Sequence, residues 1–110
     1  MSRFLPGDVV LAPVRLGQRL DRKTRPVVVL GMADDHGLLE VLPVTRTHPG
    51  SDPHLPLDLA DFAEGGLDLF ETRYILITEV CTISGSMIRG KKGRLTDECL
   101  STIGRHVVRD

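Results

Sequence analysis

Aromatic residues are scarce in this sequence of 110 residues: they make up 4% of it, and tryptophan is absent. Proteins that bind single-stranded nucleic acid without sequence preference stack the bases on aromatic rings, so the composition does not indicate such a platform. Cysteine is also rare. Cys81 and Cys99 stand in apolar surroundings without CxxC or His/Cys spacing, which predicts two small buried thiols in a reducing compartment rather than a disulfide or a metal site.

Long apolar runs are lacking as well. No segment approaches the roughly 20 apolar residues that a membrane-spanning helix needs, and residues 1–10 (MSRFLPGDVV) lack the apolar core of a signal peptide. We therefore expect a cytoplasmic protein that does not enter a membrane. The contents of hydrophobic residues (41%) and charged residues (26%) are ordinary for a globular chain, and the length predicts one domain over residues 1–110.

Motifs for metal and phosphate binding are missing too. The sequence contains neither a P-loop nor GxGxxG, and GKKG (90–93) lacks the context of a phosphate-binding loop. The segment HPGSDPH brings His48, Asp52 and His54 close together in sequence. Its loop-like composition favours surface or capping residues over metal ligands, so we expect no metal site and no cofactor.

The net charge of −1 conceals an uneven distribution of charge along the chain. Residues 1–31 contain six cations and two acids, net +4; residues 32–80 contain two cations and ten acids, net −8; residues 81–110 contain six cations and three acids, net +3. Both basic clusters fall in segments that we predict to be loops. Such a segregation favours a charged partner, although a solvated surface explains it equally well.

Alternating and β-branched stretches predict a series of short strands. The expected strands are 8–13, 26–30 (with Pro26 at the first position), 38–44, 55–59 and 73–83, the last being the longest. Residues 32–37 predict a hairpin connection, and residues 15–24 and 84–93 predict exposed basic loops. Residues 60–71 fit either one helical turn closed by Gly65-Gly66 or a turn between strands.

The last segment predicts a helix. Thr96 suits the N-cap, Asp97 and Glu98 stand in the first turn, and cations follow near the end, which matches the helix dipole. Several short strands before one amphipathic helix predict a mainly β protein, a strongly bent antiparallel sheet or barrel with a C-terminal helix. A parallel βαβ fold is excluded because no helix is predicted between the early strands.

Arg25 and Thr45 form the most distinctive candidate site. Arg25 precedes one strand and Thr45 ends the next, and both are about equidistant from the centre of the connecting turn. An antiparallel hairpin would bring them together at one rim of the sheet. A guanidinium beside a hydroxyl can bind the oxygens of a phosphate. The alternative is that Arg25 pairs with a carboxylate such as Glu40 while Thr45 merely ends a strand.

The order of these pieces resembles the MazF/PemK (Kid) family of toxins over nearly the whole chain. GDVVLAP is followed by a basic loop, TRPVVVLG, LLEVLPVT, PLDL, ITEVCTISGSMIRGKKG and a terminal helix. The resemblance depends on Gly7-Asp8, Arg25-Pro26, Pro43-Val44-Thr45 and Arg89-Gly90-Lys91.

This resemblance implies an SH3-like β-barrel of the MazF/PemK/CcdB type with a C-terminal helix, and a homodimer. It implies a growth-inhibiting toxin of a type II toxin-antitoxin system, which cleaves single-stranded RNA sequence-specifically, without a metal, and is neutralised by a cognate antitoxin. Arg25 and Thr45 match the catalytic arginine and threonine of the family. Cations of the basic segments would bind RNA phosphates: Arg15, Arg19, Arg22, Lys23, Arg89, Lys91 and Lys92.

The fifth strand departs from the family pattern. Many relatives carry an Asp-Gln pair there, whereas this sequence has Thr78-Glu79, which makes Glu79 the candidate base. The usual aromatic residue of the first strand is also replaced, by Val10 or Leu11. Two alternatives follow: a non-enzymatic toxin of the same fold that binds a protein such as gyrase, or a nucleic-acid-binding module with weakened catalysis.

Overall fold

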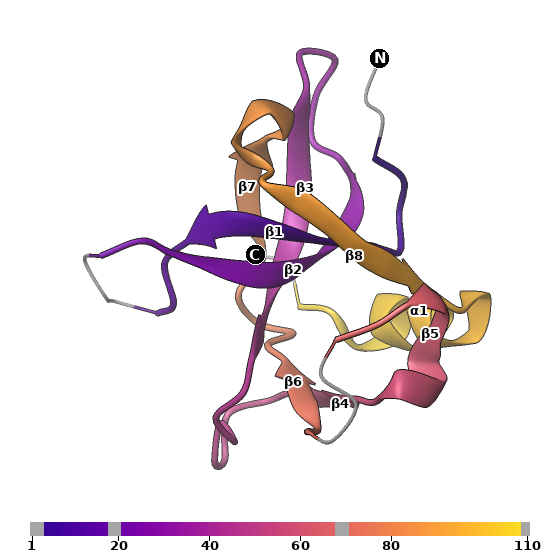
Figure 1. Cartoon of the computed structure of the whole chain (residues 1–110). Helices are drawn as coiled ribbons and strands as arrows, with labels where there is room; N and C mark the ends of the chain where they lie inside the picture. Colours follow the sequence, from indigo (N-terminus) through magenta and orange to yellow (C-terminus); the bar gives the residue numbers. More distant parts are fainter. Residues whose placement is uncertain (1–3, 18–20, 68–70, 109–110) are drawn as a thin grey trace.

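The computed structural model describes residues 4–17, 21–67 and 71–108, and it shows a strongly curled antiparallel sheet with one C-terminal helix (Figure 1). Its elements, in chain order, are β1 (Asp8–Val14), β2 (Lys23–Met32), β3 (Leu38–Thr45), β4 (Leu55–Leu57), a 3₁₀ turn (Leu59–Asp61), β5 (Phe62–Gly65), β6 (Arg73–Ile75), β7 (Cys81–Ser84), a second 3₁₀ turn (Gly85–Met87), β8 (Gly90–Leu95) and α1 (Asp97–His106). The predicted mainly β fold with a terminal helix is confirmed.

β3 is the central strand of the sheet. The strand order is β4-β6-β3-β2-β1-β8-β5, and β7 also pairs with β3. The first half of β3, Leu38–Val41, pairs with β7, and its last two residues pair with β6. On its other edge β3 pairs with β2 as far as Val27↔Pro43. β3 therefore belongs to both parts of the curled sheet.

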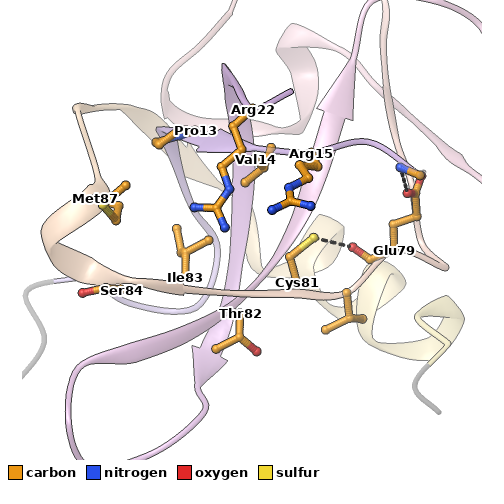
Figure 2. Close-up of a pocket in the computed structure, with 12 residues that line it drawn as sticks. Pro13, Val14, Arg15, Arg22, Glu79, Cys81, Thr82, Ile83, Ser84 and Met87 are labelled. Atoms are coloured by element: carbon orange, nitrogen blue, oxygen red, sulfur yellow. Dashed lines mark hydrogen bonds between the residues drawn. The ribbon is translucent and has the colours of Figure 1, made fainter. Parts of the chain in front are cut away.

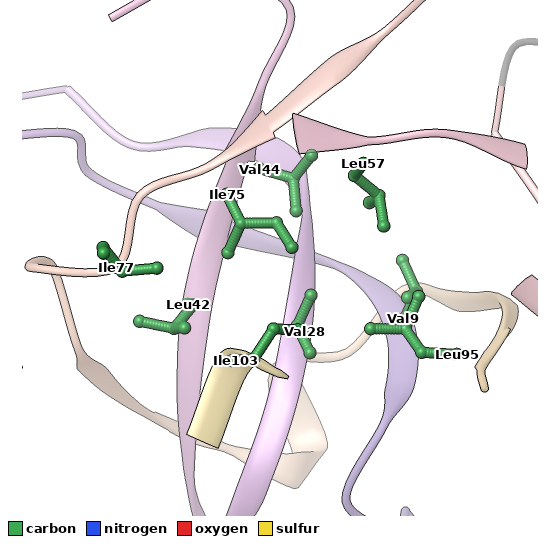
Figure 3. Close-up of a cluster of buried hydrophobic side chains, with 9 residues drawn as sticks. All are labelled: Val9, Val28, Leu42, Val44, Leu57, Ile75, Ile77, Leu95 and Ile103. Atoms are coloured by element: carbon green, nitrogen blue, oxygen red, sulfur yellow. The ribbon is translucent and has the colours of Figure 1, made fainter. Parts of the chain in front are cut away.

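Both faces of β2 are buried, which explains its continuous apolar run. Val28 packs into a cluster with Val9, Leu42 and Ile103 of the helix (Figure 3). Val27 and Val29 point to the opposite face and join a second cluster. The other members of this second cluster are Val10, Ala12, Val14, Leu39, Val41 and Ile83.

The predicted single strand over 73–83 is wrong, because the chain forms β6 and β7 with a turn between them. Both strands pair with β3, but Ile75 lies opposite Val44 and Cys81 lies opposite Val41, so the chain accommodates three extra residues between them. Pro43 lies where the two pairings meet, and its missing N–H cannot donate to a continuous partner strand.

The predicted loop over 84–93 is also wrong in its second half, where residues 90–95 form β8 between β1 and β5. Few apolar side chains mark this strand. Its pairing depends on close backbone approach: a Cβ at Gly93 would lie 2.3 Å from the carbonyl oxygen of Glu64 on β5. Glycine here permits the contact instead of marking a loop.

Other boundaries shift by a few residues. β2 begins at Lys23, so Pro26 is its fourth residue and the first basic loop is shorter than predicted. The predicted strand over 55–59 ends at Leu57, and residues 60–71 begin with a 3₁₀ turn and β5. Helix α1 is confirmed, with the Thr96 hydroxyl accepting a hydrogen bond from the Cys99 amide at 3.1 Å. Within the described ranges, no helix is long and apolar enough to cross a membrane.

Candidate functional site

Arg25 lies at the point where β2 and β3 separate. The last cross-strand pair of β2 and β3 is Val27↔Pro43, and the same register continued by two residues places Arg25 opposite Thr45. The Arg25 side chain is partly buried, and its Nε is buried without a hydrogen-bond partner in the described part of the chain. A buried guanidinium N–H without a partner is costly, so this donor is available to an incoming acceptor.

The carboxylate considered as an alternative partner of Arg25 is distant. Glu40 lies opposite Gly31, six residues from Arg25 along β2, and six residues of strand span about 20 Å. The Arg25–Glu40 pair is therefore wrong.

Thr45 is the last residue of β3, where this strand pairs with β6. It is the Cα partner of Tyr74, and its Oγ1 accepts a hydrogen bond from the Thr47 amide at 3.2 Å. Side chains at Arg25, Val27 and Val29 share one face of β2, and alternation along β3 puts Thr45 on the matching face. The structure thus places the two predicted catalytic residues on one face, at the end of the second apolar cluster.

A group of rings extends this face beyond Thr45. His48 and His54 both pack against Tyr74, with ring centroids 4.9 and 5.5 Å from the tyrosine ring, and 4.8 Å from each other. All contacts are edge-to-face in type. The sequence brings His48 and His54 together in one loop segment, but sequence reasoning missed Tyr74, because this residue comes from β6 and only strand pairing shows that it meets them.

A pocket of about 580 Å³ lies between the loop that precedes β2 and strand β7 (Figure 2). The guanidinium groups of Arg15 and Arg22 extend into it toward β7, whose Cys81 and Ile83 form the opposite wall. Two of the predicted RNA-binding cations are therefore brought together. Arg19 lies outside the described residues.

Glu79, the candidate base, lines the same pocket. It lies in the turn between β6 and β7 and not in the predicted strand. Its carboxylate accepts a hydrogen bond from the backbone N–H of Gly17 at 2.6 Å and so attaches the basic loop to the turn that precedes β7. Beside it, the Cys81 thiol donates to the Glu79 carbonyl oxygen at 3.2 Å. Burial, and then the Glu79 charge, raise the pKa of this thiol, which keeps it protonated.

The remaining predicted cations differ in their surroundings. Lys23, Arg89 and Lys92 are exposed. Lys91 instead forms an ion pair with Asp8, Nζ to Oδ1 at 3.3 Å, and Arg94 Nε contacts the same oxygen at 3.1 Å. The Asp8 side chain is only 1% exposed, and sequence reasoning missed this buried carboxylate as a structural centre.

A second partly unsatisfied guanidinium lies near the ring group. Arg73 Nε is buried without a hydrogen-bond partner within the described ranges. Its Nη2 is 4.0 Å from Glu71, which also pairs with Arg46 at 3.4 Å. An open pocket of about 790 Å³ beside Tyr74 is lined by Arg46, Thr47, Glu71, Thr72 and Tyr74. No three His, Cys, Asp or Glu side chains of the described residues are grouped as metal ligands.

Comparison with known proteins gives the family. A family model described as the PemK-like, MazF-like toxin of type II toxin-antitoxin systems matches residues 5–109. Among solved structures, Mycobacterium tuberculosis toxin MazF-mt6 is similar, with a TM-score of 0.67 and 19% identity over 91% of each chain. That identity supports the shared fold alone. No curated protein matches the sequence. Because the family model covers nearly the whole chain, this protein belongs to the PemK-like, MazF-like toxins of type II toxin-antitoxin systems.

Proposed function

We propose that this toxin is an endoribonuclease that cleaves single-stranded RNA by attack of the substrate's own 2′-OH, with Arg25 and Thr45 at the reacting phosphate. The observation that carries the proposal is the Nε of Arg25, which is buried, lacks a partner in the described part of the chain, and lies across from Thr45. Family membership supports the same conclusion.

The proposed chemistry needs no nucleophile from the protein. The 2′-oxygen attacks phosphorus, the bond from phosphorus to the 5′-oxygen breaks, and a 2′,3′-cyclic phosphate and a 5′-OH result. Negative charge develops on the phosphorane oxygens. A guanidinium is a permanent cation in proteins, so Arg25 acts by stabilising this charge and not by proton transfer. The Thr45 hydroxyl orients a phosphate oxygen beside it.

Flanking phosphates would be bound by the cations on either side of this point. Arg15 and Arg22 of the pocket in Figure 2, with exposed Lys23, Arg89 and Lys92, provide separated positive charges. Such contacts release counterions, so RNA affinity is expected to fall steeply as salt rises. We further propose a homodimer and a cognate antitoxin that blocks this surface.

The test is incubation of the purified protein with a long RNA in EDTA, followed by mapping of the cleaved ends. The wild type should yield 2′,3′-cyclic phosphate ends, and a 2′-deoxynucleotide at a mapped site should abolish cleavage there. Arg25→Ala should reduce the rate by roughly 10²- to 10³-fold, the loss typical of one preorganised charge-stabilising donor. Thr45→Ala should lower it by a smaller factor.

Arg105→Ala is the matched control, because Arg105 is an exposed arginine near the end of α1. Equal cleavage by wild type, Arg25→Ala and Thr45→Ala would show that the residue roles are wrong. Salt-sensitive RNA binding without any cleavage would instead select a nucleic-acid-binding module. Inhibition of supercoiling without RNA cleavage would select a toxin that binds gyrase.

A further inference from the structure

Two histidines of the ring group carry opposite tautomers. The Nδ1 of His54 is 2.7 Å from the carbonyl oxygen of Asp52. A carbonyl only accepts, so Nδ1 carries the proton, and the neutral ring leaves a lone pair on Nε2. The Nδ1 of His48 accepts a hydrogen bond from the Gly50 amide at 2.9 Å, so the proton of its neutral ring is on Nε2.

Each tautomer suits a different role. When His54 gains a proton on Nε2, its Nδ1–H still donates to the Asp52 carbonyl, which stabilises the resulting cation. When His48 gains a proton, it must give up the hydrogen bond from Gly50. The Nε2 lone pair of neutral His54 can therefore act as a proton acceptor, and the Nε2–H of neutral His48 can donate a hydrogen bond.

Strand pairing places both rings beside the residues of the proposed site. Tyr74, on which the rings pack, is the cross-strand partner of Thr45 on β3 and of Pro56 on β4. Cross-strand partners share a face, and residues two apart in an extended segment share it too, so His54 lies on the face of Pro56, Tyr74 and Thr45. This face continues to Arg25 through the register of β2 and β3.

We propose that His54 is the general base of this toxin, and that His48 is a hydrogen-bond donor to the substrate at the same site. The inference deepens the proposed ribonuclease function and depends on it. In the reaction, the 2′-OH proton moves to Nε2 of His54 while the 2′-oxygen bonds to phosphorus. The 5′-oxygen leaves with its bonding electrons and takes a proton from water. His54 then returns its proton to solvent.

Glu79, the candidate base from the sequence, is already engaged in a hydrogen bond, which favours His54 as the base. The Glu79 carboxylate is occupied by the Gly17 amide and lines the pocket of Figure 2. Histidine is the side chain whose ordinary ionisation falls between pH 5 and 8, which suits proton transfer near neutrality. Charged residues of the described ranges close to the ring group include Arg46 and Glu71, which pair with each other beside Tyr74, Arg73 next to Tyr74 in β6, and Asp52 in the loop between the two histidines.

The test uses His54→Asn, because the asparagine amide can keep the hydrogen bond to the Asp52 carbonyl while the Nε2 lone pair is lost. Cleavage of a mapped RNA in EDTA should fall by about 10²- to 10⁴-fold, and the rise of rate with pH below neutrality should disappear. His48→Asn, whose amide oxygen can still accept from Gly50, should lose about tenfold. Added imidazole should restore part of the activity of His54→Ala.

His106→Asn is the matched control. The Nδ1 of His106 is 2.8 Å from the Thr102 carbonyl oxygen, the same arrangement as in His54, but at the exposed end of α1. It should keep the wild-type rate and pH profile. A His54→Asn protein that cleaves within threefold of wild type with an unchanged pH profile overturns this inference and leaves the proposed function standing. A wild type that does not cleave RNA overturns both.

Discussion

The buried carboxylate of Asp8 gives two neighbouring lysines of the basic segment GKKGR, Lys91 and Lys92, different expected roles, which an experiment can separate. Asp8 joins three parts of the chain: its Oδ2 accepts from the Leu5 amide at 2.9 Å, and its Oδ1 contacts Lys91 and Arg94. Lys91 was predicted to bind RNA, yet its ammonium is already paired. Lys92, the next residue, is exposed and is the extra residue of a bulge between the pairs Val10↔Lys91 and Val9↔Gly93. We expect Asp8→Ala to destabilise the protein, and Lys91→Ala to do so mildly.

The magnitude follows from the contacts. The Leu5 hydrogen bond to a charged acceptor is worth about 1.5 kcal/mol. The Lys91 and Arg94 side chains are 39% and 37% exposed, so solvent screening limits each pair to about 0.5–1 kcal/mol. Asp8→Ala should therefore cost about 2.5–3.5 kcal/mol. Asp8→Asn, which can keep an acceptor for Leu5, should cost about 1–2 kcal/mol, and Lys91→Ala about 0.5–1 kcal/mol.

The assay is urea unfolding at one fixed protein concentration, combined with RNA binding at low salt. Lys91→Ala should shift the unfolding midpoint and leave RNA affinity nearly unchanged, whereas Lys92→Ala should leave the midpoint unchanged and weaken RNA binding. The fixed concentration matters because dimerisation would contribute to stability. Equal loss of RNA affinity in the two lysine variants, without a change in stability, would refute the structural role assigned to Lys91.

Three further predictions concern stability and thiol reactivity. Gly93→Ala should destabilise the protein by about 1–3 kcal/mol in urea unfolding, because its Cβ would lie 2.3 Å from the Glu64 carbonyl oxygen. Gly90→Ala is the control and should cost less than about 1 kcal/mol, because a Cβ there would have no atom within 4 Å. Equal losses in the two variants would contradict the close β5–β8 contact. Ile103→Ala, which removes the fully buried helix residue of Figure 3, should cost about 2–5 kcal/mol in the same assay, and a loss below 1 kcal/mol would mean that α1 does not pack as described. Burial, followed by Asp61 and Glu98, raises the pKa of Cys99 to about 11, so its alkylation near pH 8 should be about 100-fold slower than that of a thiol at the reference value of 9.0. Because the pKa of Cys99 is higher in the folded state than in the unfolded state, the stability contributed by this thiol is present below pH 9 and is lost as pH rises toward 11. Alkylation of Cys99 at the rate of the urea-unfolded chain would contradict its burial.

Local patterns predicted those parts of the fold that depend on local chemistry. The Thr96 cap and the acids after it define the start of α1, and the hairpin over 32–37 follows from its turn residues. β8 was missed because its pairing depends on glycines that let the backbones of β5 and β8 approach, and glycine in a sequence indicates a loop as readily as a close contact.

The candidate site was predicted in the same uneven way. The position of Arg25 opposite Thr45 could be predicted by counting residues across one hairpin, because a tight antiparallel turn sets the register of its two strands. The ring group of His48, His54 and Tyr74 depends on β6 pairing with the end of β3, a contact between segments distant in sequence. Counting residues across a hairpin cannot predict such contacts, because the long connection between β3 and β6 does not set the register of their pairing.

Two prolines explain why the sheet separates at this site. The carbonyl of Val29 accepts from Gly7 on the β1 side, and that of Leu11 accepts from Arg89, away from β2. Since amide directions alternate along a strand, an N–H at Pro26 would point at β3. The carbonyl of Pro43 accepts from Leu76 on the β6–β7 side, so an N–H at Pro43 would point there. Pro26 therefore removes the donor that would continue the β2–β3 ladder, and Pro43 removes one that would continue β6 into β7. The residues just beyond the first break are Arg25 and Thr45. Their backbones are held by the neighbouring strands, through the pairs Ala12↔Arg25 and Thr45↔Tyr74, while they are released from pairing with each other, which leaves their side chains available to a phosphate.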